Sequence, residues 1–227
     1  MPDCNRKQFI LISSAKAYLL KGMIYMAKYK GMSHIYPKDI LALSVLAHSG
    51  SINRESLKNF VSENRIKTFE KSLIKKVAYP EKYGAGTRES FVLTNMGKQF
   101  VKNECRIDKI VSNGESYHHN ENVSRWICQN LDKQEIGSIL NERQARDIIE
   151  DHLSHYREQG DFERYYELQE QLEQGKMSMP DFIYRDSSTG EMVCIEITTS
   201  SYKEADITAK EMAAEELGMA IQFVNAT

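Results

Sequence analysis

The chain has 227 residues, of which 41% are hydrophobic and 27% are charged. This length allows one large domain or two small ones, and the composition predicts a globular chain and excludes a disordered one. The longest apolar stretch, Phe9 to Ala27, is interrupted by lysines, so neither a membrane span nor a signal peptide is predicted. Four widely spaced cysteines without a CxxC pattern exclude a zinc ribbon and predict a reducing, cytoplasmic location.

The net charge of −2 is the sum of two halves of opposite sign. Residues 1–110 hold 20 Lys and Arg against 9 Asp and Glu, whereas residues 111–227 hold 10 against 23. This asymmetry predicts two domains, 1–110 and 116–227, joined at the polar stretch 112–116. The basic half suits a polyanion such as double-stranded DNA. Alternatively, the two halves simply attract each other.

Three helices are predicted in the basic half from the spacing of their apolar residues. Each is flanked by residue types that favour helix ends. The helices and these flanking residues are 38–48 with Pro37 and Gly50, 54–61 with Asn53, and 63–77 with Ser62. A further helix is predicted over residues 7–30, which extends this domain or pairs across a homodimer.

A glycine-rich turn at 83–88 and a strand at 90–93 follow the third helix. Thr94 is then a candidate N-cap for another helix. The pattern LTxxGxxF that begins at Leu93 resembles the end of many winged-helix domains. Residues 36–102 therefore resemble a winged helix-turn-helix, which implies DNA binding.

The third helix is then the expected recognition helix, and its polar side chains are candidates for contacts with phosphates or base edges. The DNA-binding candidates are Asn64, Arg65, Lys67, Thr68, Lys71, Lys75 and Lys76, with Arg88 in the predicted wing. The alternatives are a solvated lysine face and a winged helix that binds a protein.

The acidic half begins with a predicted helix and a short strand, followed by two charged helices that break near Gly160-Asp161. A hairpin, a helix and a closing strand are predicted after them. The expected ranges are 118–131, 136–140, 142–174, 179–198, 202–217 and 220–224. Asp181 and Glu196 lie on the two strands of the hairpin, where paired carboxylates would favour a hard cation such as Mg²⁺.

The spacing from Pro180-Asp181 to Glu196 resembles the PD-(D/E)xK nuclease superfamily, and the element order resembles its αβββαβ core. The resemblance implies a Mg²⁺ or Mn²⁺ site formed by Asp181 and Glu196, with Glu142 or Glu121 as a third acid. The lysine of the family motif is replaced by Thr198. Lys203 or Lys210 could supply the amine instead; otherwise the domain keeps the fold without cleavage.

A winged helix followed by a nuclease-like domain resembles the replication-relaxation proteins of mobile genetic elements, and the cues are His118-His119, Pro180-Asp181 and Glu196-Ile197-Thr198. This implies a DNA-binding protein of a plasmid, phage or integrative element that acts in replication, mobilisation or its regulation. The alternatives are an active Mg²⁺-dependent endonuclease and a transcriptional regulator whose acidic domain binds a protein partner. The sequence has no phosphate-binding glycine loop and no Ser-His-Asp order, which excludes nucleotide hydrolysis and acyl transfer.

Overall fold

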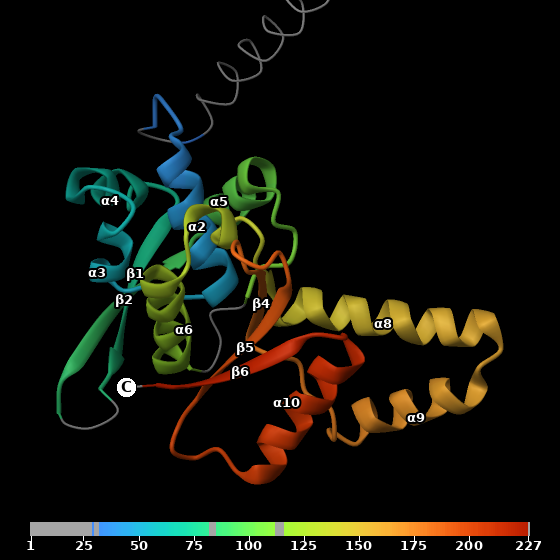
Figure 1. The fold of residues 1–227 in the computed structure, drawn as a ribbon. Coiled ribbons are helices and arrows are strands. Elements are labelled where there is room, and N and C mark those ends of the chain that lie inside the picture. Colours follow the sequence, from blue (N-terminus) through green and yellow to red (C-terminus); the bar gives the residue numbers. More distant parts are fainter. Residues whose placement is uncertain (1–28, 30–31, 82–84, 112–115, 227) are drawn as a thin grey trace, which may run out of the picture.

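The computed structural model describes residues 29, 32–81, 85–111 and 116–226. Within these residues the chain is a mixed α+β protein with one two-stranded and one four-stranded sheet (Figure 1). The helix expected over residues 7–30 and the joint expected at 112–116 lie almost wholly outside the described residues. None of the described helices is long and apolar enough to cross a membrane.

The first two described helices follow the sequence pattern. α2 (Pro37–Ser49) ends at Gly50, whose φ of 81° is a left-handed conformation that glycine adopts without strain. α3 (Arg54–Lys58) begins after Asn53, whose side chain accepts a hydrogen bond from the backbone N–H three residues later. α3 ends before the predicted limit of Val61. The two helices nevertheless confirm the predicted order of elements in this part of the chain.

The third helix is shorter than its lysine-rich sequence predicts. α4 covers Glu63–Phe69, so the prediction of a helix over 63–77 was wrong. Residues Ile74–Pro80 form strand β1 instead, which pairs antiparallel with β2 (Thr87–Leu93) along its whole length. The reason is that β2 needs a partner for its backbone N–H and C=O groups, and this tertiary pairing outweighs the local helical pattern.

The hairpin leads into a capped helix, as the sequence predicts. α5 (Asn95–Phe100) begins after Thr94, whose hydroxyl accepts a hydrogen bond from the Gly97 N–H (3.0 Å). A Cβ on Gly97 would lie 2.0 Å from the Leu73 carbonyl oxygen, so only glycine lets α5 pack this closely on the chain that enters β1. α5 continues into a π-helical turn, η1 (Val101–Cys105).

The second half follows most of the predicted element order. Its helices and strands are α6 (Tyr117–Asn130), α8 (Glu142–Gln159), α9 (Phe162–Glu173), β4 (Phe182–Arg185), β5 (Met192–Thr198), α10 (Glu204–Glu216) and β6 (Ala220–Asn225). The strand predicted over 136–140 was wrong: α7 (Lys133–Ile136) and the two-residue strand β3 (Leu140–Asn141) occupy this region. Asp132 explains α7, because its carboxylate accepts hydrogen bonds from two backbone N–H groups of the first helical turn.

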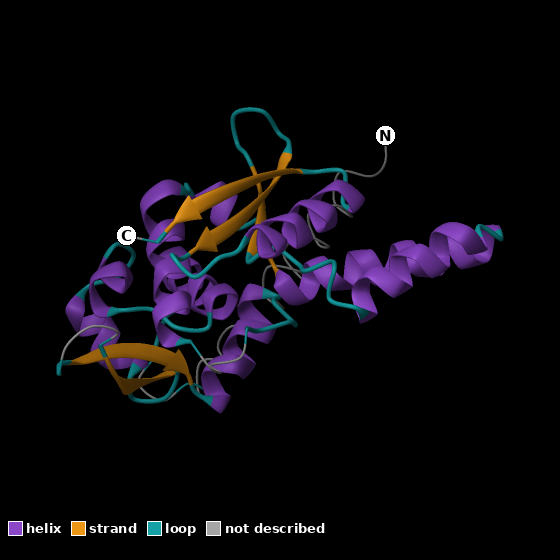
Figure 2. Ribbon diagram, turned by 90° about the horizontal axis from the view of Figure 1, so that it is seen from below, coloured by secondary structure: helices purple, strands orange, loops and turns teal. Residues whose placement is uncertain are grey.

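The four-stranded sheet has the order β3-β4-β5-β6, and helices cover both of its faces. β5 and β6 run parallel, with α10 as the connection between them. Phe182 and Ile195 point toward α6, whereas Ile183 and Cys194 pack with residues of α8 and α10. α8 and α9 lie side by side and project away from the sheet (Figure 1, Figure 2).

One hydrophobic core extends across the two halves. Leu43 and Leu46 of α2 belong to the same buried cluster as Val123 and Ile127 of α6 and Ile195 of β5. A second cluster lies among α8, α9, α10 and the opposite face of the sheet. The charge pattern therefore changes near residue 112, whereas the apolar packing is continuous; the division into two domains stays a prediction.

Candidate functional site

Two carboxylates lie side by side where β4 begins. Asp181 directly precedes β4, and Glu196 lies in the adjacent strand β5. The Asp181 N–H donates to Glu196 Oε2 (3.0 Å), and the Ile197 N–H donates to Asp181 Oδ2 (2.8 Å). The structure thus brings together the two acidic residues of the predicted hairpin, and backbone N–H groups fix both side chains.

Three further side chains complete what we call the buried charge cluster: His119, Asp181, Glu196, Tyr202 and Lys210. His119 Nε2 of α6 lies 2.8 Å from Asp181 Oδ1. Lys210 Nζ of α10 lies 3.0 Å from Glu196 Oε1, and the Tyr202 hydroxyl donates to the same oxygen. Because side chains alternate along a strand, Glu196 points to the face of β5 that α10 covers, where Lys210 reaches it.

Burial and charge set the protonation of this cluster. Glu196 is fully buried; burial first and the charge of Asp181 second raise the pKa of its carboxyl group, while Lys210 opposes the rise. Burial alone would lower the pKa of His119, but the hydrogen bond and the charge of Asp181 outweigh it, so the pKa is raised. The raised pKa favours the imidazolium form of His119 beside Asp181, while the ammonium group of Lys210 lies beside Glu196.

The bonding within the cluster competes with a divalent metal ion. Mg²⁺ or Mn²⁺ is held by carboxylate oxygens. Each oxygen of Asp181 and Glu196 already accepts at least one hydrogen bond from the protein, so a metal ion would have to share these oxygens with their present donors. Within the described residues, no group of three or more His, Cys, Asp or Glu side chains could hold a metal ion. Lys210 and His119 are the basic groups that lie against the two acids.

The other residues expected from the nuclease resemblance lie elsewhere. Glu142 is exposed at the first residue of α8, and Glu121 turns toward the first half, where its Oε1 accepts from the Ser90 hydroxyl (3.1 Å). Thr198 is buried and donates to Asn225 Oδ1 (2.9 Å), which ties β5 to β6. Lys203 is exposed at the residue before α10. Lys210, the second of the two alternative lysines, is the one beside Glu196.

The predicted DNA-binding residues fall into two groups. Exposed candidates without an ion-pair partner among the described residues are Lys67 of α4, Lys71 in the following turn and Lys75 of β1. Arg65 turns inward instead: its Nε lies 3.0 Å from Oδ1 of the buried Asp39 on α2, and a second nitrogen bonds the other oxygen. Arg65 therefore fastens α4 to α2.

The remaining DNA-binding candidates are either ion-paired within the hairpin or uncharged. Lys76 Nζ lies 3.0 Å from Glu89 across the hairpin, and Arg88 Nε lies 3.4 Å from Glu81. Asn64 is exposed on α4, and the Thr68 hydroxyl donates to the backbone C=O of Asn64. The prediction that Lys75 and Lys76 lie on a recognition helix was wrong. Both residues lie in β1, because this segment pairs with β2.

The acidic residues around α4 pair with basic residues of α3 and not with the exposed lysines. Glu63 and Glu70 both pair with Arg54 of α3, and Lys58 pairs with Glu63 and Glu55. These pairs set two positive charges against three negative ones, so they leave one negative charge beside the three exposed lysines, whose own positive charges exceed it. We call Lys67, Lys71 and Lys75 the basic face; α4 and β1, which carry Lys67 and Lys75, lie on the side of the molecule opposite to α8 and α9 (Figure 1).

A polar cleft of about 750 Å³ runs between the hairpin and the second half. Arg88 of β2 lines it from the first half, and His118, His119 and Arg125 line it from α6. The hydroxyl-bearing residues 199–201, which follow β5, form another wall. His119 thus belongs both to this cleft and to the buried charge cluster.

Sequence patterns alone gave no role to His119 or Tyr202 and left Lys210 as one of two alternative lysines. The spacing of His119 and Lys210 from buried residues of their own helices could have shown that both side chains face inward. His119 stands four residues before the buried Val123, and Lys210 stands three residues before the buried Ala213, so each lies on the inward face of its helix. Tyr202 precedes α10, and no periodic pattern marks it.

Comparison with protein-family models, with curated proteins and with solved structures finds no match for this chain.

Proposed function

We propose that the protein binds double-stranded DNA through the basic face and the β1–β2 hairpin, with residues 36–102 acting as a winged helix-turn-helix. The observation that carries the proposal is the set of three exposed lysines without counter-charges, on an element order of three helices and a hairpin. Phosphate groups are the ligands that such uncompensated ammonium groups attract most strongly.

The neighbouring packing supports this role for α4. The bond between Arg65 and Asp39 holds α4 against α2, and Asn53 and Thr94 cap the helices on either side of the α4–hairpin unit. A helix that contacts base edges must be held rigidly so that its side chains are placed correctly in a DNA groove. The cleft beside Arg88 would give the DNA backbone a second contact region, because its lining includes hydroxyl and basic groups that suit phosphates. The two acids of the lining are bonded within the protein, Glu81 to Arg88 and Glu121 to Ser90.

The resemblance to nucleases adds a second candidate, phosphodiester cleavage. The specific observation in its favour is the Lys210 amine beside Glu196, where the family motif lacks its lysine at Thr198. Against it, a metal ion there would have to share every carboxylate oxygen with a donor from the protein and lie close to the Lys210 ammonium group. Non-cleaving DNA binding, in the replication or mobilisation of a mobile element or in its regulation, is therefore the function that we propose.

Fluorescence anisotropy with a labelled 30-base-pair duplex and the full chain tests the proposal. The variant Lys67→Gln/Lys71→Gln/Lys75→Gln should bind roughly tenfold to a hundredfold more weakly at 0.1 M salt. The plot of log affinity against log salt should also become shallower by about 2.7, because each lost phosphate contact removes about 0.9 from the slope.

A charge-matched control carries Lys102→Gln, Lys176→Gln and Lys203→Gln, three exposed lysines outside the basic face. It should keep the affinity of the unchanged protein within about threefold, since only unspecific long-range attraction is lost. Equal losses in the two triple variants would contradict a localised binding face. A chain that binds no duplex at 50 mM salt would overturn the proposal altogether.

A further inference from the structure

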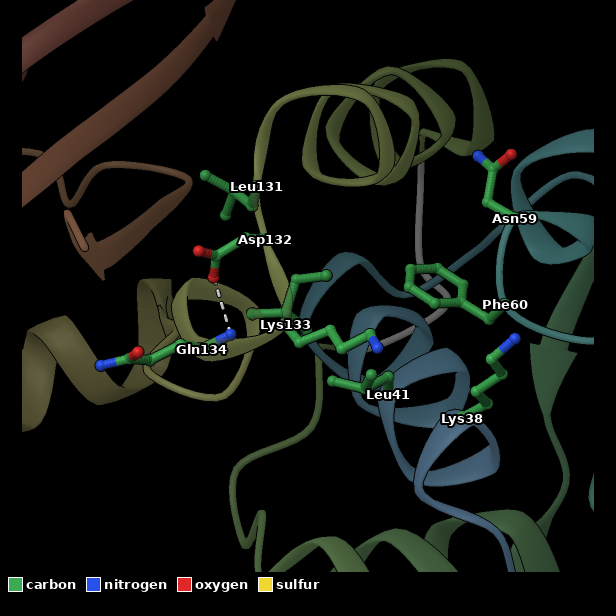
Figure 3. A pocket seen from close by; sticks show the side chains of 9 residues that line it. Lys38, Leu41, Asn59, Phe60, Leu131, Asp132, Lys133 and Gln134 are labelled. Atoms are coloured by element: carbon green, nitrogen blue, oxygen red, sulfur yellow. Dashed lines mark hydrogen bonds between the residues drawn. The ribbon is translucent and has the colours of Figure 1, made fainter. Parts of the chain in front are cut away.

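A pocket of about 520 Å³ lies at the junction of the two halves, away from the basic face and the buried charge cluster. Its walls come from α2, from the turn between α3 and α4, and from the segment that links α6 to α7 (Figure 3). This volume falls within the range of roughly 300–1,000 Å³ that is typical of small-molecule sites, which favour such junctions.

The floor of the pocket is apolar. Leu41 and Phe60 come from the first half, and Leu131 and Ile136 come from the second. Leu41, Phe60 and Leu131 are only partly buried, so they keep apolar surface in contact with water. An apolar ligand body that covered this surface would be stabilised by the area it removes from water.

Two ammonium groups stand over this floor. Figure 3 shows Lys38 extending toward Phe60 and Lys133 extending toward Leu41. Neither lysine has an ion-pair partner in the part of the chain that the structure describes. The carboxylate of Asp132, the acidic residue of the lining, accepts hydrogen bonds from the backbone N–H groups of Gln134 (2.7 Å) and Glu135 (2.9 Å) instead.

We propose that this pocket binds a small amphipathic carboxylate, with the apolar body on Leu41, Phe60 and Leu131 and the carboxylate between Lys38 and Lys133. The combination favours this class over two others: a purely apolar ligand would gain nothing from the two amines, and a small hydrophilic anion would leave the floor uncovered. The ligand touches the turn before α4 and the second half at once.

Isothermal titration calorimetry of the full chain with decanoate tests this proposal. Decanoate combines one carboxylate with an apolar chain short enough for the pocket volume, and decanol is the matched uncharged probe. We expect saturable one-to-one binding of decanoate, binding about tenfold weaker by decanol, and an equal loss of about tenfold for decanoate in the Lys38→Gln/Lys133→Gln variant.

The charge-matched control Lys176→Gln/Lys203→Gln should bind decanoate as the unchanged protein does, because both of these lysines are exposed away from the pocket lining. A variant that fills the pocket, Leu41→Trp, should abolish the binding of both probes. Absence of saturable decanoate binding to the unchanged protein overturns the proposal. Decanoate binding that is unchanged in both Lys38→Gln/Lys133→Gln and Leu41→Trp also overturns it. The calorimetric measurements do not depend on DNA binding, so they test this proposal separately from the proposed function.

Discussion

The basic face and the buried charge cluster hold their charges in opposite ways. Lys67, Lys71 and Lys75 are exposed and have no ion-pair partner among the described residues, whereas Asp181 is partly buried, Glu196 is fully buried, and both carboxylates are bonded to the protein through each oxygen. An exposed ammonium group is stable in water without a partner, so its charge stays available to a ligand. A buried carboxylate must be compensated inside the protein, and that compensation occupies the atoms a ligand would need.

This difference between the two regions is the reason that we assign DNA binding to the basic face. The hairpin carboxylates carried the resemblance to a catalytic motif, yet their oxygens bind partners from α6, α10 and the backbone. The lysines around α4 carried the resemblance to a DNA-binding domain, and they have no ion-pair partner among the described residues. Each region can be tested by removing one of its charged side chains and measuring whether protein stability or DNA affinity changes.

The largest effect is expected in the buried charge cluster. Lys210→Met should lower the free energy of unfolding by about 3–5 kcal/mol at pH 7, because it leaves the charge of Glu196 buried without its ammonium partner. Urea unfolding measures this. The loss should be smaller at pH 5, since Glu196, whose pKa is already raised, can take up a proton instead.

Lys203→Met is the matched control, because Lys203 is exposed at the start of the same helix. Its effect should stay within about 0.5 kcal/mol. The double variant Lys210→Met/Glu196→Gln should recover part of the loss, since it removes the uncompensated charge. A loss below about 1 kcal/mol in Lys210→Met would show that water or another group compensates Glu196.

The next effect separates stability from binding within α4 itself. Arg65→Gln should lower the free energy of unfolding by about 2–3 kcal/mol, because the buried Asp39 loses its charged partner. DNA affinity of the folded variant should remain within about twofold, measured by anisotropy well below the unfolding temperature. A tenfold loss of affinity with unchanged stability would return Arg65 to the DNA-contacting set.

Sequence patterns predicted the elements whose signals are local. The caps at Asn53 and Thr94, the glycine end of α2 and the break at Gly160 all lie as expected, because each depends on a few neighbouring residues. The hairpin of β4 and β5 was predicted for the same reason, since its turn residues lie next to the strands that they join.

The features that were missed depend on distant partners. β1 is a strand because β2 pairs with it, and the local sequence alone favours a helix there. Arg65 became a structural residue through Asp39, which lies 26 positions earlier in the chain. His119 meets Asp181 only after α6 has packed on the sheet. The identity of the amine beside Glu196 likewise required the position of α10.

A pH effect is expected at the junction between the halves. His48 of α2 is buried, and burial lowers its pKa to about 4. In the unfolded chain the group titrates near 6.5, so its neutral, folded form loses stability as the pH falls from 6.5 toward 4, by about 1.4 kcal/mol per pH unit. Urea unfolding at pH 6 and pH 5 measures this slope.

His48→Gln should flatten the slope by that amount, whereas His155→Gln, which changes an exposed histidine on α8, should leave it unchanged. Other groups also titrate in this range, so the difference between the two variants is the informative quantity. An identical slope in the two variants would mean that His48 is protonated in the folded protein.

The smallest effect is expected from divalent metal ions, and it decides between DNA binding and cleavage. A Mg²⁺ or Mn²⁺ ion at Asp181 and Glu196 would have to share carboxylate oxygens with Lys210, His119 and two backbone N–H groups, and its charge would be repelled by Lys210. We therefore expect 10 mM Mg²⁺ to change the unfolding temperature equally in the unchanged protein and in Asp181→Asn, with no cutting of duplex, single-stranded or branched DNA. Stabilisation or cleavage that requires Mg²⁺ and disappears in Asp181→Asn would show that the metal does bind at these carboxylates. The cluster would then be a catalytic site, and Lys210→Ala would test whether its amine replaces the one that Thr198 lacks.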